Sequence, residues 1–201
     1  MNKSWIQRLA SDIEAKYGKE AKERIFGDTS NVKGKEATAL WFDNMTTGMD
    51  SLNDKEFLRQ MMARRCPCGG DYRTEGQAFK EFYDKSKTLE EFVDAIRVYW
   101  AKKWQGAEDI AELRGNALYL TKRPGKGRVH GSYGKGCHCS LAKYTEKIVS
   151  DIFCHCCTIG HTGKSFQYAF GGDIKMEFVE SIICGGKGCT MAVHLPEKQE
   201  G

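Results

Sequence analysis

Residues 173–195 read DIKMEFVESIICGGKGCTMAVHL, and this stretch predicts two β-strands joined by a tight turn. Apolar and polar residues alternate on both sides of residues 185–188, GGKG, and this alternation is the period of a β-strand. A glycine-rich turn between two alternating segments is typical of an antiparallel hairpin. Cys184 and Cys189 flank the turn.

The chain before the hairpin has mostly helical patterns. Apolar residues recur three and four positions apart after Ser4, after Asn53 or Asp54, around residues 79–83, and after Thr88. Residues 116–121 (NALYLT) predict a further strand, and residues 141–153 predict a helix. We therefore predict an α+β fold with a helical N-terminal half (1–112) packed on a C-terminal α/β domain (113–201) that carries the antiparallel β-hairpin. The two parts can also form one continuous domain.

The composition limits the class of protein. The 201 residues are enough for a sizeable core, and a net charge of +4 over this length argues against a nucleic-acid partner. The first residues include acids and no apolar run, so we expect no signal peptide. No stretch approaches the roughly 18 apolar residues that span a membrane, so we expect no membrane partner and a cytoplasmic location. The sequence is compatible with a homodimer.

Nine cysteines give the main functional signal. Disulfides are uncommon in reducing cytosol, where clustered cysteines more often bind metal or do redox chemistry. Two CxC pairs, one CHCC run and the two hairpin cysteines therefore predict a metal site, with zinc as the metal. An iron–sulfur cluster and free buried thiols are the alternatives.

The spacing suggests which cysteines share an ion. Cys154, Cys157 and His161 lie three, four and seven positions apart, on one face of a helix that continues through residue 160. Cys184 and Cys189 flank the turn on one sheet face, where facing Cβ atoms are about 4.5–5.5 Å apart. We predict that Cys154, Cys157, Cys184 and Cys189 hold the zinc ion.

Nine cysteines exceed one tetrahedral site, so a second metal site is predicted in two glycine-rich loops. Its candidate ligands are Cys66 and Cys68 in CPCGG, and Cys137 and Cys139 in GKGCHCS. Cys156 continues an apolar stripe, so we interpret it as a small buried hydrophobic residue.

Glu180 is a candidate catalytic residue. It falls on the apolar face of the first hairpin strand, where an unpaired carboxylate is costly. It could be a metal ligand, a partner of a ligand or a general base, or a bulge could carry it to water. His155 is interpreted as a surface residue or a partner of a ligand, and His194 should face away from Cys189.

Residues 153–195 resemble the end of the 4-vinyl reductase-like domain family. The shared pattern is a cysteine-bearing helix followed by Gly160, a strand with Glu180-Ser181, then Cys184, a glycine-rich turn and Cys189. The region is also similar to the cysteine-containing end of aminothiazoline-carboxylate hydrolase-like proteins. The resemblance implies an α/β small-molecule-binding fold, and zinc held by Cys154 or Cys157 together with Cys184 and Cys189.

These observations lead to three functional hypotheses. The first is a zinc-binding protein whose α/β domain binds a small organic ligand, as a ligand sensor or carrier, with Met176, Phe178 and Tyr168 as candidate pocket residues. The second is a metal- or thiol-dependent hydrolase that uses Glu180 or a cysteine. The third is an iron–sulfur or redox protein.

Overall fold

The computed structural model describes residues 3–30, 32–66, 71–103, 111–122, 137, 142–145 and 147–198. None of the described helices combines the length and the apolar character needed to cross a membrane. The helices of the first half are α1 (Lys3–Phe26), α2 (Lys35–Asp50), α3 (Lys55–Arg64), α4 (Tyr72–Lys85) and α5 (Leu89–Lys103).

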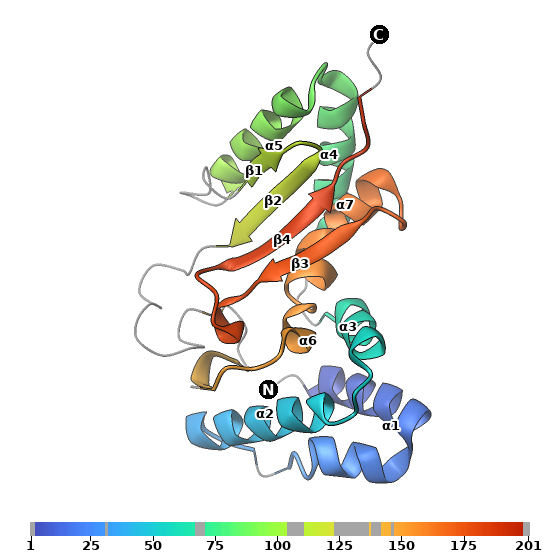
Figure 1. The fold of residues 1–201 in the computed structure, drawn as a ribbon, viewed down its shortest axis with the longest axis vertical. Helices are drawn as coiled ribbons and strands as arrows, with labels where there is room; N and C mark the ends of the chain where they lie inside the picture. The colour runs from blue at the N-terminus through green and yellow to red at the C-terminus, as the bar shows by residue number, and fades with distance from the viewer. Residues whose placement is uncertain are drawn as a thin grey trace.

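In the described part of the chain, four strands form one antiparallel sheet in the order β1-β2-β4-β3 (Figure 1). Their bounds are β1 (Ala111–Arg114), β2 (Ala117–Lys122), β3 (Met176–Glu180) and β4 (Cys189–His194). Met176 lies opposite Val193, and Phe178 lies opposite Met191. The predicted α+β class and the predicted hairpin are therefore confirmed, and β4 is an inner strand because it also pairs with β2.

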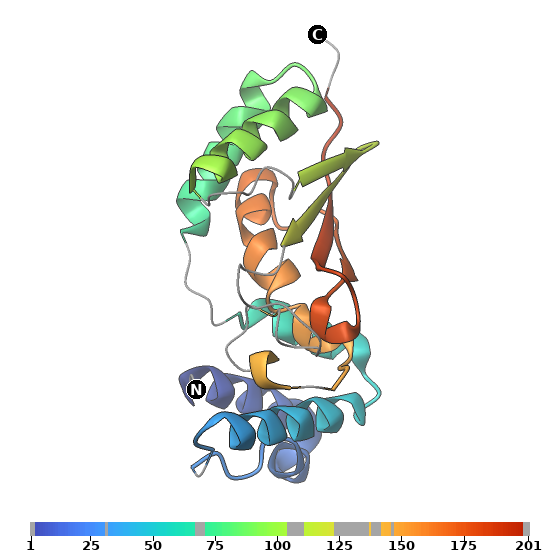
Figure 2. The same cartoon turned by 90° about the vertical axis from the view of Figure 1, so that its left-hand side faces the viewer.

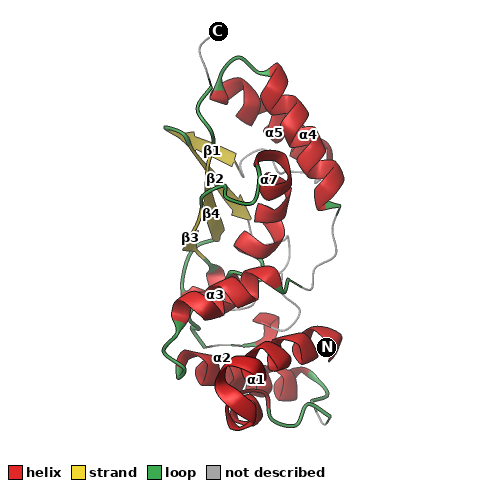
Figure 3. Ribbon diagram, turned by 90° about the vertical axis from the view of Figure 1, so that its right-hand side faces the viewer, coloured by secondary structure: helices red, strands yellow, loops and turns green. Residues whose placement is uncertain are grey.

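The helices α4, α5 and α7 cover one face of the sheet (Figures 2 and 3). The side chains between them form one of two hydrophobic cores. Phe79 and Phe166 are fully buried in it, with ring centroids 4.9 Å apart. Inward residues of β2 and β4 complete this core, as the alternation of those strands requires.

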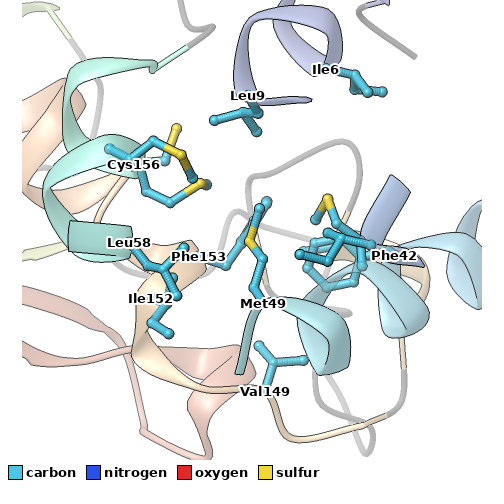
Figure 4. Close-up of a cluster of buried hydrophobic side chains, with 14 of the residues drawn as sticks. Ile6, Leu9, Phe42, Met49, Leu58, Val149, Ile152, Phe153 and Cys156 are labelled. Carbon is cyan, nitrogen blue, oxygen red and sulfur yellow. The ribbon is translucent and has the colours of Figure 1, made fainter. Parts of the chain in front are cut away.

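A second core lies among α1, α2, α3 and α6, at the other end of the molecule (Figures 1 and 4). Phe42 of α2 packs edge-to-face on Phe153, with ring centroids 4.6 Å apart. Each fully buried aromatic side chain stabilises the fold by about 1.5–3 kcal/mol relative to an exposed one. Both cores contain residues from each side of residue 112, and the predicted division at that point stays a prediction.

A helical path links the two cores. It consists of α6 (Asp151–Cys154), the wider π-helical turn η3 (Thr158–Thr162) and α7 (Gly163–Phe170). Gly160 permits this path to touch α3, because a Cβ at this position would lie 2.3 Å from the carbonyl oxygen of Ala63. The helix therefore continues through residue 160, with a π-helical turn there.

The helix predicted over residues 141–153 is wrong in its extent. Between β2 and α6, the only helical element among the described residues is the short 3₁₀ turn η2 (Ala142–Tyr144). The backbone N–H of Val149 donates to the carbonyl oxygen of Ile183, 2.9 Å away. This segment therefore hydrogen-bonds to the end of the hairpin, and α6 begins only at Asp151.

Candidate functional site

Two cysteines from distant parts of the chain meet where α6 ends beside the hairpin. The sulfur atoms of Cys154 and Cys184 are 3.9 Å apart, within reach of an S–H···S hydrogen bond. The hydroxyl oxygen of Ser181 lies 2.9 Å from the sulfur of Cys154. Cys154 and Ser181 are buried, whereas Cys184 is partly exposed.

A local departure from the predicted strand produces this meeting. We expected residues 173–184 to form one strand, but β3 ends at Glu180 after a bulge, and a 3₁₀ turn, η4 (Ile182–Cys184), follows. The carbonyl oxygen of Ser181 accepts hydrogen bonds from the N–H groups of Cys184 and Gly186, at 3.1 and 2.8 Å. Gly185 adopts a left-handed conformation (φ 91°) that suits glycine, so the chain can close this turn.

The two thiols differ in their acidity. The hydrogen bond with Cys184 and burial raise the pKa of Cys154 well above its usual value. The same hydrogen bond lowers the pKa of Cys184 against the opposing effect of burial, and the Ser181 hydroxyl lowers it further. Cys184, the more exposed of the two, is therefore the more acidic thiol of the pair.

Two further cysteines lie within electrostatic range of this pair. Cys137 is buried, and its charge contributes to the raised pKa of Cys154. The pKa of Cys189, at the start of β4, is raised first by burial and also by Cys184. Among the described residues, no group of three or more His, Cys, Asp or Glu side chains is arranged to hold a metal ion.

The predicted ligands are thus brought together only in part. Cys154 and Cys184 meet, and Cys189 is a neighbour of Cys184. Cys157 is half-buried, and its carbonyl oxygen accepts a hydrogen bond from the Lys122 ammonium at 3.2 Å. Its place in the ligand set stays a prediction.

The second predicted site lies partly outside the described residues. These residues include Cys66 and Cys137 but not Cys68 or Cys139. Cys137 was assigned to that second site from its CxC spacing, whereas the structure places it near Cys154. Cys156 is buried in the core beside α1 and α3, as predicted (Figure 4).

Glu180 lies at a bulge in β3, which is one of the alternatives that the sequence left open. Its carboxylate accepts hydrogen bonds from the Lys187 N–H at 3.1 Å and from the Thr190 hydroxyl at 3.3 Å. Both of its oxygens therefore stabilise the hairpin turn. A catalytic role for Glu180 stays a prediction. Ser181 beside it was noted in the sequence only as half of a Glu-Ser pair, and its contact with Cys154 had no sequence signal.

A cleft of about 710 Å³ lies between α3, α6, η3 and β3. Its apolar walls include Met176 and Phe178, two of the predicted pocket residues. Tyr168, the third, lies on α7 against Gly76 of α4 and is not part of this wall. The polar lining consists of Glu56, Arg59, Gln60, Asp151, His155 and Glu177.

His155 is held firmly in this cleft. Its Nδ1 is 3.0 Å from the carbonyl oxygen of Asp151, which can only accept, so Nδ1 carries the proton. The imidazole stacks on Phe178, with ring centroids 5.2 Å apart at 26°. Burial lowers the pKa of His155, against the opposing effect of Asp151, so the ring is neutral and Nε2 is a hydrogen-bond acceptor.

Arg59 fixes the carboxylate beside His155. Its Nε and Nη2 donate to the two oxygens of Asp151 at 2.6 and 3.0 Å, which is a bidentate pair. Burial opposes ionisation of Asp151, but Arg59 more than offsets it and holds the pKa of this carboxyl below its usual range. The pair joins α3 to the first residue of α6.

The comparisons with known proteins give one match. Residues 114–200 match a family of unknown function, DUF6144. No curated protein and no solved structure matches the chain. The matched region contains Cys137, Cys154, Cys184 and Cys189, whereas α1–α5 precede it.

Proposed function

We propose that this protein binds one zinc ion through Cys154 and Cys184, with Cys137 and Cys189 as the remaining ligands. The observation that carries the proposal is the 3.9 Å separation of the first two sulfur atoms. Two thiolates on one tetrahedral zinc, each bound at about 2.3 Å, lie about 3.8 Å apart. The structure thus supports two ligand positions, and Cys137 and Cys189 are the neighbouring thiols that could supply the others.

The location suggests what the metal would do. Cys154 ends α6, which packs in the helical core, and Cys184 and Cys189 belong to the hairpin. An ion bound by all three would join the helical core to the sheet. Metal-binding free energy would then contribute to folding free energy, as in other structural zinc sites.

Elemental analysis tests the proposal. Protein made under reducing conditions without added metal should contain about one zinc per chain. Cys154→Ser and Cys184→Ser should each lose most of it, because serine is a poor zinc ligand. Cys156→Ala is the matched control, since Cys156 is a neighbouring buried cysteine that we interpret as core. Zinc-free wild-type protein, or a Cys184→Ser variant with full zinc content, would contradict the proposal.

A dithiol redox pair is the second candidate, and the unequal acidity of the two thiols favours it. The Cys184 thiolate would attack a small-molecule disulfide, form a mixed disulfide and release one thiolate. Cys154, after losing its proton, would then attack the Cys184 sulfur and release the second thiolate. The products are a Cys154–Cys184 disulfide and two reduced thiols. Peptide mapping after mild oxidation would reveal this disulfide, and visible absorption would reveal the iron–sulfur alternative.

A further inference from the structure

The cleft between α3, α6, η3 and β3 is separate from the proposed zinc ligands. Its volume of about 710 Å³ lies within the range of small-molecule sites, roughly 300–1,000 Å³. We propose that it binds a small organic amine in its protonated form, with an apolar body. The inference goes beyond zinc binding and does not require the metal.

The charge of the lining favours a cation. Three carboxylates line the cleft, from Glu56, Asp151 and Glu177, together with the guanidinium of Arg59. Arg59 directs two donors to Asp151, so these two charges largely cancel. Glu56 and Glu177 remain as carboxylates that can meet a ligand. Lys175 pairs with Glu177, so Glu56 is the carboxylate of the lining that has no ion-pair partner among the described residues, and an anionic ligand would have to approach it.

Each of these glutamates keeps one oxygen for a ligand. Oε1 of Glu56 accepts from the Gln60 amide at 2.7 Å. Oε1 of Glu177 contacts the ammonium of Lys175 at 2.7 Å and Nε2 of His194 at 3.0 Å. In the part of the chain that the structure describes, neither Oε2 has a protein donor. Lys175 weakens the field of Glu177, so Glu56 is the stronger candidate for the ammonium.

His155 adds an imidazole ring to the same space. Its Nδ1 proton is used by the Asp151 carbonyl, and none of the described residues donates to Nε2. An ammonium group has three donors and no acceptor, which matches the carboxylate acceptors of the cleft better than a hydroxyl or a carboxylate does. The polar part of the cleft is therefore complementary to an amine.

The opposite wall accounts for the apolar body. Ile159, Met176 and Phe178 line it and are only partly buried. Covering them would remove apolar surface from water, at about 25 cal/mol for each Å². Phe178 could also meet the cation with its ring, a contact that contributes about 0.5–1 kcal/mol at an exposed site.

Calorimetric titration with three matched probes tests the inference: 2-phenylethylamine, 2-phenylethanol and 3-phenylpropionate. They share an apolar body and differ in their polar group. We expect the amine to bind at least about tenfold more tightly than the alcohol, the energy of one charge-assisted contact, about 1.4 kcal/mol. The carboxylate should bind more weakly than either. Glu56→Gln should remove most of the preference for the amine, and Phe178→Ala should weaken the amine and the alcohol alike.

The controls make each outcome decisive. Glu81→Gln removes an exposed carboxylate of α4 that is not part of the cleft lining, and should leave amine binding unchanged. The imidazole NMR signals of His155 should shift with the amine, which locates binding even if a variant is unstable. Equal affinity for amine and carboxylate, unchanged binding in Glu56→Gln, or binding of none of the probes would overturn the inference. Zinc content, measured on the same samples, tests the zinc proposal independently.

Discussion

Replacing Gly160 by alanine would place a methyl group 2.3 Å from the carbonyl oxygen of Ala63 and 2.8 Å from its Cα. Both atoms belong to the backbone of α3, so no flexible side chain can move aside. Overpacking costs about 1–3 kcal/mol, and a clash with backbone atoms belongs in the upper part of this range, about 2–3 kcal/mol. Alanine in a helix regains about 1 kcal/mol relative to glycine, so we expect a net loss of about 1–2 kcal/mol. For a chain of this length, that loss lowers Tm by about 2–8 °C.

Urea unfolding followed by circular dichroism would measure this loss. Gly172→Ala is the matched control, because a Cβ at residue 172 would meet no atom within 4 Å. We expect this control to be neutral or slightly stabilising, since alanine restricts the unfolded chain. If Gly160→Ala were as stable as Gly172→Ala, the close contact between η3 and α3 would be wrong, and so would the shape of the cleft beside it.

Three further predictions follow from buried or paired groups. Because the pKa of Asp151 is lowered in the folded state, its ion pair with Arg59 stabilises the protein above the usual pKa of aspartate, about 3.9. Asp151→Asn should therefore be less stable than the wild type by about 1 kcal/mol near pH 7, a small value because Arg59 is 35% exposed. The difference should shrink as the pH falls through the lowered pKa of Asp151. Equal stability of Asp151→Asn and the wild type at neutral pH would contradict this prediction. Phe42→Ala should cost about 3–5 kcal/mol in urea unfolding, since Phe42 is fully buried; a loss below about 1 kcal/mol would mean that its core is loosely packed. Burial and Asp54 raise the pKa of Tyr17 to about 12, so an ultraviolet titration of the wild type should include a tyrosine that ionises near pH 12. Tyr17→Phe should lack this ionisation step, and an unchanged titration curve would rule this assignment out.

Helix starts could be predicted because their determinants are close in sequence. The side chain of Asp54 accepts a hydrogen bond from the N–H of Phe57 and caps α3. Thr88 likewise accepts from the N–H of Glu91, whose carboxylate bonds back to the N–H of Lys87. These contacts span three or four residues, so the sequence alone specifies them.

The end of β3 could not be predicted for the opposite reason. Strand alternation continues through Ile182 and Cys184, but the backbone turns after Glu180. The N–H of Val149 donates a hydrogen bond to the carbonyl oxygen of Ile183, a partner more than thirty positions away. A local pattern carries no information about a partner at that distance. The strand was therefore predicted too long, and the preceding helix was predicted to start too early.

The sequence by itself determined the class of fold, the hairpin, and the abundance of cysteines near its turn, because periodicity and composition are local properties. Only the tertiary structure decided that Cys154 meets Cys184, that Cys137 lies near this pair, and that Ser181 contacts it. It also decided that His155 faces a cleft with Glu56. Pairs such as these are formed when separate segments pack on shared cores, and packing depends on the shapes of side chains far apart in the chain.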